Sequence, residues 1–293
     1  MSQNKLLIDD LLILQGKSLA NLNICSPFIN SIQYYEYKVF SQFGEDGIIQ
    51  HLIHELKLEK EEQVFIEFGV QNYEESNTRF LLMNNNWQGL VIDGDENNIS
   101  HIKSQNFYWR NDLTAVQAWV DKENINQIIS DNKFNGPIGI LSIDVDGNDY
   151  WIWESITAVD PAIVIIEYNS LFGPIHPVTT PYNPQFRREI AHYSYLYWGG
   201  SISAFAHMGT IKGYSLVGSN TAGNNLFFIK NERLGRLKPL NAKNAYIECR
   251  FRESRDPSGN LNFLKGKERI KEIEAMKLIN VLTNEPELIR DLI

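Results

Sequence analysis

The sequence predicts an α/β fold, in which helices cover both faces of a mostly parallel sheet that is bordered by an antiparallel hairpin. Three observations favour this fold. Short runs rich in Val, Ile and Phe alternate with polar stretches that suit helices. These runs have no polar face, which is typical of parallel strands buried on both sides. The last two runs are separated only by a short cluster of turn residues, as in a β-hairpin.

The first part of the chain is expected to form two helices and then most of the sheet. One helix is expected near Lys5–Leu14, and another over Glu45–Leu56, where aliphatic residues recur on one face. The strands are expected at Val64–Val70, Gly89–Gly94, Phe107–Asn111, Ile138–Val145 and Ala162–Tyr168. Helices are expected between them near Asn77–Asn84, Asn97–Ser104, Asn124–Ser130 and Tyr150–Ile156.

The later part of the chain adds the hairpin and a C-terminal extension. Two helical patterns after Phe186 precede the expected hairpin strands Tyr214–Ser219 and Asn225–Lys230. Periodicity is lost beyond Glu232 until a charged amphipathic helix expected near Lys267–Leu278. We therefore divide the chain into a helical N-terminal extension (1–39), a core (40–232) and a helical C-terminal extension (233–293).

Composition and charge narrow the classes of partner. The 293 residues include 43% hydrophobic and 22% charged side chains, which is ordinary for a globular chain. The formal net charge is −9, and an acidic surface repels phosphate backbones, so nucleic acid is not expected as a partner. The cluster Arg250, Arg252 and Arg255 is interrupted by acids and is interpreted as a solvated surface.

The sequence carries no signal for a membrane or for an oxidising compartment. Cys25 and Cys249 cannot make a disulfide framework and lack metal-ligand spacing. The apolar N-terminal stretch contains Asp9 and Asp10 and has no small-residue cleavage site, so it is a poor signal peptide. No run approaches the roughly 20 apolar residues that span a bilayer. A cytoplasmic protein without membrane insertion is therefore expected.

Acids and amides follow the predicted strands at the edge where a doubly wound sheet binds its ligands. Gly69 would allow a close backbone approach in the first turn. Asp93 lies 24 residues further on, close to the spacing of an acid that binds both ribose hydroxyls. This spacing predicts a nucleoside cofactor. Other acids stand near the ends of later expected strands, at Asp112, Asp144 and Glu167.

The first turn favours S-adenosylmethionine over a dinucleotide. A dinucleotide site needs Gly-x-Gly-x-x-Gly, whereas this turn has only Gly69 and is flanked by Glu67 and Glu75. Acids at the start of a helix repel a pyrophosphate. The same acids are compatible with the ammonium and sulfonium groups of S-adenosylmethionine.

Several motifs, taken in order, resemble those of the FkbM-type S-adenosylmethionine-dependent methyltransferases. The resemblance spans roughly Phe40 to Ile229. It is carried by Ser41-Gln-Phe-Gly-Glu-Asp46, Val64–Gly69 with Glu75-Ser-Asn-Thr78, Gly89-Leu-Val-Ile-Asp93, Ile143-Asp-Val-Asp-Gly-Asn-Asp149, Glu167-Tyr-Asn169, Lys212-Gly-Tyr214 and Gly223-Asn-Asn-Leu-Phe-Phe228. The first turn departs from the family because it lacks the usual multiple glycines, and aspartate replaces the usual glutamate at Asp93, Asp146 and Asp149.

The resemblance implies a Rossmann-like class I methyltransferase sheet in the core, with S-adenosylmethionine as its cofactor. It also implies O-methylation of a sugar or another small hydroxyl-bearing metabolite, in polysaccharide or natural-product pathways. Asp93 would hold the ribose. Together with the strand-end argument, the resemblance gives these candidate cofactor-binding residues: Gln42, Glu45, Asp46, Glu67, Gly69, Asn77, Asp93, Asp112 and Asp144.

Methyl transfer to an alcohol needs a base, or a metal ion that lowers the pKa of the hydroxyl. Asp144 is the leading candidate for the base, with His176 and His207 as alternatives and His192 behind them. Mg²⁺ or Mn²⁺ would prefer an all-oxygen set, and such a set is offered by Asp144, Glu167 and Asn169.

Two other functions stay open. An NAD-linked oxidoreductase would need a glycine-rich first turn, which is absent, and a Tyr-x-x-x-Lys pair, of which we find no convincing example. A non-catalytic nucleoside-binding partner protein would keep the fold without needing Asp93, Asp144 and Glu167 together. The residues past Glu232 could wrap the core, cover the site or form a contact in a homo-oligomer.

Overall fold

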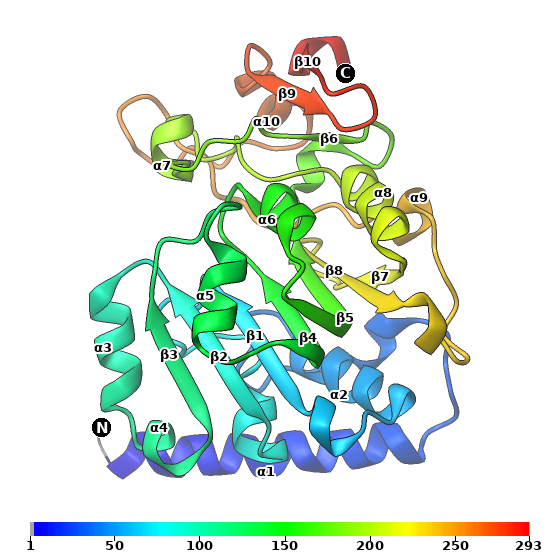
Figure 1. Ribbon diagram of the computed structural model, residues 1–293. Coiled ribbons are helices and arrows are strands. Elements are labelled where there is room, and N and C mark those ends of the chain that lie inside the picture. The colour runs from blue at the N-terminus through cyan, green and yellow to red at the C-terminus, as the bar shows by residue number, and fades with distance from the viewer. Residues whose placement is uncertain (1–2, 293) are drawn as a thin grey trace.

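The computed structural model describes residues 3–292 and contains a seven-stranded sheet in the order β3-β2-β1-β4-β5-β8-β7 (Figure 1). Neighbouring strands from β3 to β5 are parallel, whereas β8 is antiparallel to β5 and β7 is antiparallel to β8. The predicted α/β fold, with a mostly parallel sheet and an antiparallel hairpin at its edge, is confirmed. Its strands are β1 (Val64–Phe68), β2 (Gln88–Asp93), β3 (Leu113–Gln117), β4 (Gly136–Ile143), β5 (Val159–Glu167), β7 (Tyr214–Ser219) and β8 (Asn225–Lys230).

The order of the parallel strands reverses at β1, which lies between β2 and β4. Ile66 in the middle of β1 is in register with Leu90 of β2 and with Leu141 of β4. In sheets of this kind ligands bind outside the carboxyl ends of the strands, where the strand order reverses. The topology therefore predicts a ligand site among the residues that follow β1, β2, β4 and β5.

One face of the sheet is covered by α5 (Ile125–Asp131), α6 (Asp149–Ser155), α8 (Ile202–Lys212) and the short α9 (Ala242–Ala245). Trp153 of α6 lies near the centre of this layer, with its ring 4.9 Å from that of Phe228 in β8. Both side chains are almost fully buried, so their large apolar areas contribute strongly to stability.

The other face is covered by α2 (Glu45–Leu56), α3 (Glu96–Ser104), α4 (Asn106–Arg110) and the π-helix η3 (Leu81–Asn85). Helix α2 begins and ends where the sequence predicts. Ile48, Ile49 and Leu52 recur at helical spacing, and all three are buried against the sheet. The apolar stripe of this helix therefore determines its position.

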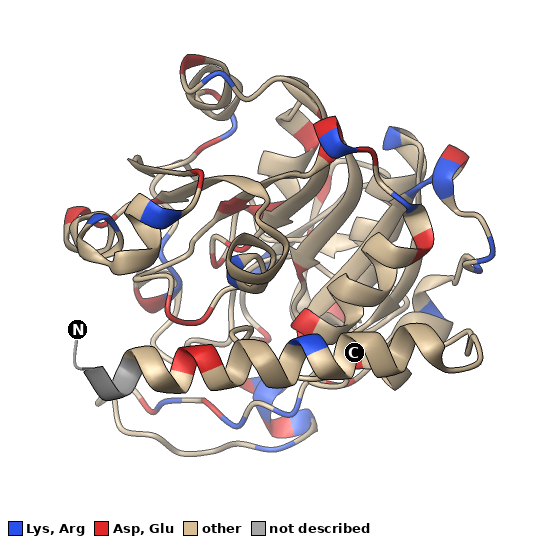
Figure 2. Ribbon diagram, turned by 90° about the horizontal axis from the view of Figure 1, so that it is seen from below, with Lys and Arg blue, Asp and Glu red and all other residues tan. Residues whose placement is uncertain are grey.

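Helix α1 (Gln3–Cys25) forms an outer layer against α2 and is longer than the predicted Lys5–Leu14. It continues until two residues before Pro27, which could not continue it. Figure 2 shows α1 lying across the molecule with acids near its start and a basic residue further along. Its exposed side carries Leu7, Leu11, Leu14 and Leu22. Among the described residues, no helix is long and apolar enough to cross a membrane.

The predicted third strand, Phe107–Asn111, is wrong. Helix α4 occupies most of this run, and Phe107 is buried with its ring 5.8 Å from that of Tyr73. The real third strand, β3, starts at Leu113 and alternates between buried and half-buried residues. Such alternation suits an edge strand better than an aromatic run does. The error moves the end of this strand from Asp112 to Gln117.

The C-terminal extension is not purely helical as predicted. Helix α10 (Lys267–Glu272) ends before Leu278, which belongs to β9 (Lys277–Asn280). Leu278 is buried with Ile273 and Val178, and this burial favours a strand over a continued helix. A three-stranded antiparallel sheet results, shown at the top of Figure 1, and it consists of β6 (Val178–Thr179), β9 and β10 (Glu285–Leu288). The division at residue 232 thus separates two strands, β6 and β9, that pair.

Candidate active site

Two cavities meet at the carboxyl ends of β1 and β4. The large cavity has a volume of about 560 Å³ and extends over the ends of β1, β2, β3 and β4. The small cavity has a volume of about 210 Å³ and extends over the ends of β4 and β5. Both are bordered by the same five residues, which are Gly69, Gln71, Asp144, Asp146 and Arg188.

The turn after β1 is shaped by Gly69. This residue has a φ of +70° and packs against the backbone carbonyl of Asp144, and its own N–H donates to the carbonyl oxygen of Ile92 at 3.0 Å. A glycine is therefore needed here both for its conformation and for its lack of a side chain. The predicted close approach at Gly69 is real, and it brings the ends of β1, β2 and β4 together.

Asp93 joins the turns that follow β1 and β2. Its Oδ2 accepts a hydrogen bond of 2.7 Å from the backbone N–H of Gln71, and its Oδ1 accepts from the Asp95 N–H at 2.9 Å and from Asn98 Nδ2 at 3.0 Å. Asp93 borders the large cavity. A carboxylate offers about four acceptor positions, so Asp93 keeps capacity for a ligand hydroxyl.

Glu67 and Asn77 build the scaffold beneath the first turn. Glu67 accepts hydrogen bonds from Ser76 Oγ at 2.6 Å and from the N–H groups of Asn77 and Thr78. Burial raises its pKa despite these bonds. Asn77 Nδ2 donates to Ser142 Oγ at 3.1 Å. Neither Glu67 nor Asn77 borders either cavity, so the structure places both behind the turn.

Asp46 is enclosed by its own loop. Its Oδ2 accepts three backbone N–H bonds, from Val39, Phe40 and Ser41, and a fourth bond from Ser41 Oγ. Burial raises its pKa to about 6. This bonding makes Asp46 a structural residue rather than a ligand of the cavities.

Glu45 links the same loop to the hairpin, because it accepts from Asn220 Nδ2 at 2.6 Å and from Asn225 Nδ2 at 3.0 Å. The loop that these bonds fix carries Gln42, which borders the small cavity. Of the three residues predicted in this upstream element, only Gln42 therefore reaches a cavity.

Asp112 lies away from the site. It is an exposed residue that precedes β3, so it stands at the amino end of that strand, and it borders neither cavity. The carboxyl end of β3 contributes Gln117 and Trp119 instead. Trp119 is held by a hydrogen bond of 2.8 Å from its Nε1 to the carbonyl oxygen of Pro184. The misplaced strand explains both the wrong prediction and the missed tryptophan.

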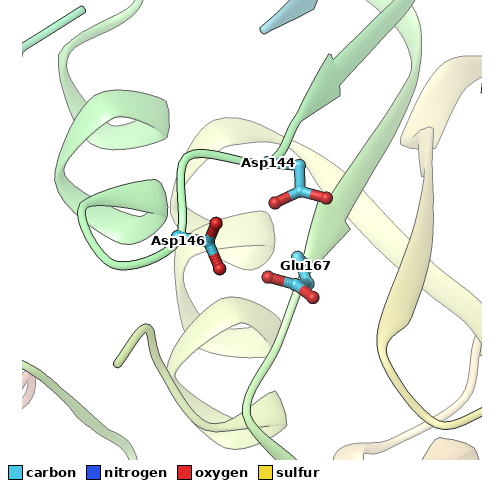
Figure 3. Close-up of side chains that lie close together, drawn as sticks. All are labelled: Asp144, Asp146 and Glu167. Atoms are coloured by element: carbon cyan, nitrogen blue, oxygen red, sulfur yellow. The ribbon is translucent and has the colours of Figure 1, made fainter. Parts of the chain in front are cut away.

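Three carboxylates converge where the cavities meet. One oxygen from each of Asp144, Asp146 and Glu167 lies within 4.8 Å of the others, and Figure 3 shows the three side chains turned toward one another. Burial, followed by the charges of Asp146 and Asp149, raises the pKa of Asp144 well above its usual value. Burial and the charge of Asp144 do the same for the pKa of Glu167. Both carboxyl groups therefore bind a proton more tightly than a carboxyl group in water does.

The loop after β4 is tied down by Asp149 at the start of α6. Its two carboxylate oxygens accept from the N–H groups of Val145 and Gly147, each at 2.9 Å. Burial raises the pKa of Asp149 to about 6. Between these anchors Asp146 has a φ of 55°, an uncommon value for a residue with a side chain. Asp146 is thereby directed toward Arg188, whose Nη1 lies 3.3 Å from its Oδ1.

The side chain of Asn169, a predicted metal ligand, is engaged in hydrogen bonds within the protein. Its Nδ2 donates to the carbonyl oxygens of Leu196 and Trp198, both at 3.0 Å, and its Oδ1 accepts from the N–H of Leu171. All of its polar atoms are thus engaged. The carboxylate oxygens that lie close enough to share a metal ion belong to Asp144, Asp146 and Glu167. Of the predicted ligands, Asn169 is therefore replaced by Asp146.

The predicted histidines lie apart from the carboxylates. His176 borders a separate apolar cavity of about 190 Å³, next to Leu171 and Ile270. His207 lies within α8 and borders neither the large nor the small cavity. His192 follows α7 (Arg188–Ala191) and bonds through Nδ1 to Ser194 Oγ at 2.7 Å. Of the predicted bases, only Asp144 borders both cavities.

The small cavity is completed by residues that the sequence did not reveal. They come from three segments beyond β5 and are Arg188, Trp198, Cys249, Phe251, Glu253 and Arg269. The run around Arg250 was interpreted as a solvated surface, but its apolar and acidic members face the cavity. The alternation of Cys249, Phe251 and Glu253 at every second position was the available signal, since such residues of an extended segment share one side.

No model of a known protein family matches the chain, and no curated protein matches it. Among solved structures, the N-terminal domain of EvdMO1 with S-adenosylhomocysteine bound is 12% identical, with a TM-score of 0.42 over 78% of this chain and 97% of that chain. A putative O-methyltransferase from Klebsiella pneumoniae is 12% identical, with a TM-score of 0.41 over 76% and 90% of the two chains. TrmK of M. capricolum, in complex with S-adenosylhomocysteine, is 11% identical, with a TM-score of 0.35 over 62% and 68%. These are likenesses of fold at low sequence identity.

Proposed function

We propose that this protein is an S-adenosylmethionine-dependent O-methyltransferase that acts on a hydroxyl group of a sugar or another small metabolite. The observation that carries the proposal is the junction of the two cavities. Asp93 borders the large cavity, and Asp144 borders both cavities. A cofactor in the first cavity and an acceptor in the second would thus meet beside a carboxylate. The resemblance to the FkbM-type family agrees with this arrangement.

The residues of the large cavity fit the proposed cofactor. Asp93 keeps capacity for a ribose hydroxyl, and the first turn carries no glycine-rich cradle for a pyrophosphate. Asn148 also borders this cavity, and its buried Oδ1 has no hydrogen-bond partner among the described residues. A buried acceptor without a partner is costly, so a ligand amine there would be favourable. S-adenosylmethionine, when bound, supplies an electrophilic methyl group on a sulfonium.

Asp144 would bind the acceptor hydroxyl and take its proton. Its raised pKa makes Asp144 a stronger proton acceptor than a solvent-exposed aspartate, as a general base requires. Glu167 lies beside Asp144, whose charge raises the pKa of Glu167. Arg188 forms an ion pair with Asp146, which lies next to Asp144 and Glu167. Positioning by these side chains would align the acceptor oxygen for in-line attack.

A metal ion is the second candidate for activating the hydroxyl, because three carboxylate oxygens converge within 4.8 Å. Asp144, Asp146 and Glu167 would hold Mg²⁺ or Mn²⁺ through oxygen ligands. Such an ion lowers the pKa of a bound hydroxyl. The ion pair between Arg188 and Asp146 already compensates one of these three charges, so we favour the base.

Calorimetric titration of the full chain with S-adenosylhomocysteine and with NAD, in parallel, tests the proposal. We expect micromolar binding of S-adenosylhomocysteine and no binding of NAD. Binding of NAD alone would replace the proposal with an oxidoreductase. Binding of neither nucleoside by the folded protein would remove the methyltransferase proposal.

A further inference from the structure

The small cavity has an acidic wall and a cationic wall. Asp144 and Glu167 form the acidic wall at the ends of β4 and β5, whereas Arg188 of α7 and Arg269 of α10 form the other. The groups that act electrostatically on Arg269 are Arg188, Glu248 and Cys249. The charge of Arg188 also acts on Glu167, so Arg188 is the cation that interacts with the acidic wall.

The two arginines differ in how far they are compensated. Arg188 lies 3.3 Å from Asp146 and 3.5 Å from Glu253, and its Nε donates to the carbonyl oxygen of Tyr195 at 2.8 Å. Arg269 has no ion pair and no side-chain hydrogen bond within the described part of the chain, and its Nε is shielded from solvent. A guanidinium remains charged in proteins, so Arg269 presents unused donors and a charge without an ion-pair partner.

Arg269 is held in place by the apolar neighbours of its own helix. Ile270 packs against the core of the small sheet, and Ile273, just after α10, is fully buried there. The guanidinium therefore projects from an anchored helix rather than from a free loop. A donor that is already positioned binds an anion with less loss of side-chain entropy.

The cavity is also bordered by a strap, residues 247–253, which hydrogen bonds and ring contacts hold in place. The Ile247 carbonyl oxygen accepts from Tyr168 Oη at 2.6 Å, the N–H of Cys249 donates to Ser170 Oγ at 2.9 Å, and the ring of Phe251 lies 4.8 Å from that of Phe43. The strap and α10 thus enclose the cavity next to β5. A ligand there would touch both an apolar ring and a cation.

We propose that the small cavity binds an acceptor that carries an anionic group, a carboxylate or a phosphate, besides the hydroxyl that is methylated, and that Arg269 binds this anion. The inference rests on the proposed function and specifies its acceptor. The hydroxyl lies against Asp144, and the anion lies against the planar fork of Arg269, which matches carboxylate and phosphate oxygens. Arg188 already forms ion pairs with Asp146 and Glu253, so Arg269 is the residue that distinguishes an anionic acceptor from an uncharged one.

Calorimetry of the full chain with three sugars tests the inference. The probes are D-glucuronate, D-glucose 6-phosphate and uncharged D-glucose, each titrated with and without saturating S-adenosylhomocysteine. We expect at least one anionic sugar to bind about tenfold or more tightly than glucose, the effect of one charge-assisted hydrogen-bonded contact. The first two probes distinguish a carboxylate from a phosphate.

Variants of two arginines in the C-terminal extension test whether Arg269 causes the preference for the anionic sugar. Arg269→Gln should remove the preference for the anionic sugar while the affinity for S-adenosylhomocysteine stays unchanged. Arg290→Gln is the matched control, because Arg290 is 61% exposed and its nearest acid, Asp291, lies 3.9 Å away. Arg269→Lys, which keeps the charge but loses the fork, should retain part of the preference and supports the assignment if Arg269→Gln is unstable.

Three results would overturn the inference: equal affinity for all three sugars, no binding of either anionic sugar, or a preference that survives in Arg269→Gln. Failure of the proposed function is distinguished from these results by the nucleoside titration. If S-adenosylhomocysteine does not bind, the methyltransferase proposal fails, while the sugar titrations without nucleoside still decide whether Arg269 binds an anion.

Discussion

The carbonyl oxygen of Asp144 occupies the space that a side chain on Gly69 would need. A Cβ at Gly69 would lie 1.6 Å from that oxygen, far inside van der Waals contact. The ends of β1 and β4 therefore touch through their backbones, at the point where the two cavities meet. This contact fixes the position of Asp144 relative to the turn that holds Asp93.

Replacing Gly69 should damage the whole junction. We expect Gly69→Ala to lower the free energy of unfolding by about 3 kcal/mol or more, because it adds a backbone clash to an unfavourable φ. Gly136→Ala is the control, since Gly136 has a φ of +80° but nothing within 4 Å of its Cβ position. It should cost only about 1 kcal/mol. Urea unfolding of both variants makes the comparison, and equal losses would show that the contact with Asp144 does not matter.

Asp93 should determine the affinity for the nucleoside. We expect Asp93→Asn to weaken binding of S-adenosylhomocysteine about 10- to 100-fold, because a charged acceptor becomes a neutral one. Asp112→Asn is the matched control and should bind like the wild type, since Asp112 lies outside both cavities. Calorimetry measures both affinities. A normal affinity in Asp93→Asn would refute the assignment of the ribose to this residue.

Methyl transfer should depend on Asp144 but not on a metal ion. Once an acceptor is found, Asp144→Asn should reduce the rate by about 100-fold or more, as is usual on loss of a general base. The affinity for S-adenosylhomocysteine should change much less. Treatment with a chelator should leave the wild-type rate unchanged. Loss of activity on chelation, with recovery on addition of Mg²⁺ or Mn²⁺, would instead assign the three carboxylates to a metal.

His51 should make the protein less stable in acid. Burial lowers the pKa of His51 to about 4 from its usual 6.5, and its ring stacks on Tyr35 with centroids 3.5 Å apart. Between these two values the unfolded chain binds more protons than the folded one, so stability is full above pH 6.5 and falls as the pH drops toward 4.

The variant His51→Phe isolates this effect, because a phenyl ring keeps the stacking and the buried Nε2 has no hydrogen-bond partner to lose. We expect the free energy of unfolding to fall by about 2 kcal/mol less in the variant than in the wild type between pH 7 and pH 4.5. Urea unfolding at both pH values measures it. The same fall in both proteins would mean that His51 does not titrate in this range.

Much of the sheet could be predicted because burial on both faces leaves a local signal. β1, β2, β4 and β5 coincide with apolar runs, and the hairpin strands β7 and β8 match their predicted bounds. β3 was missed because an edge strand is only half buried, while the aromatic side chains of α4 imitate a strand. Phe107 is buried by tertiary contact with Tyr73, which no local pattern reports.

The candidate site could be predicted only where strand ends supply it. Gly69, Asp93 and Asp144 follow directly from the strand positions. Glu67 and Asp46 are acids in the right motifs, yet they accept hydrogen bonds from their own loops. Whether a carboxylate faces a cavity or its own backbone depends on loop geometry, which spacing does not encode. Arg269 lies more than a hundred residues beyond β5, so only the folded chain brings it to the small cavity.

The small cavity draws one of its walls from the end of the chain, whereas the large cavity is bordered only by residues between Gly69 and Glu189. During synthesis from the N-terminus, all residues that border the large cavity are therefore made before the last residues that border the small cavity. The same separation lets evolution replace the strap and α10 without disturbing the turn that contains Gly69. Relatives of this protein could thus diverge in what they modify while they keep the same nucleoside.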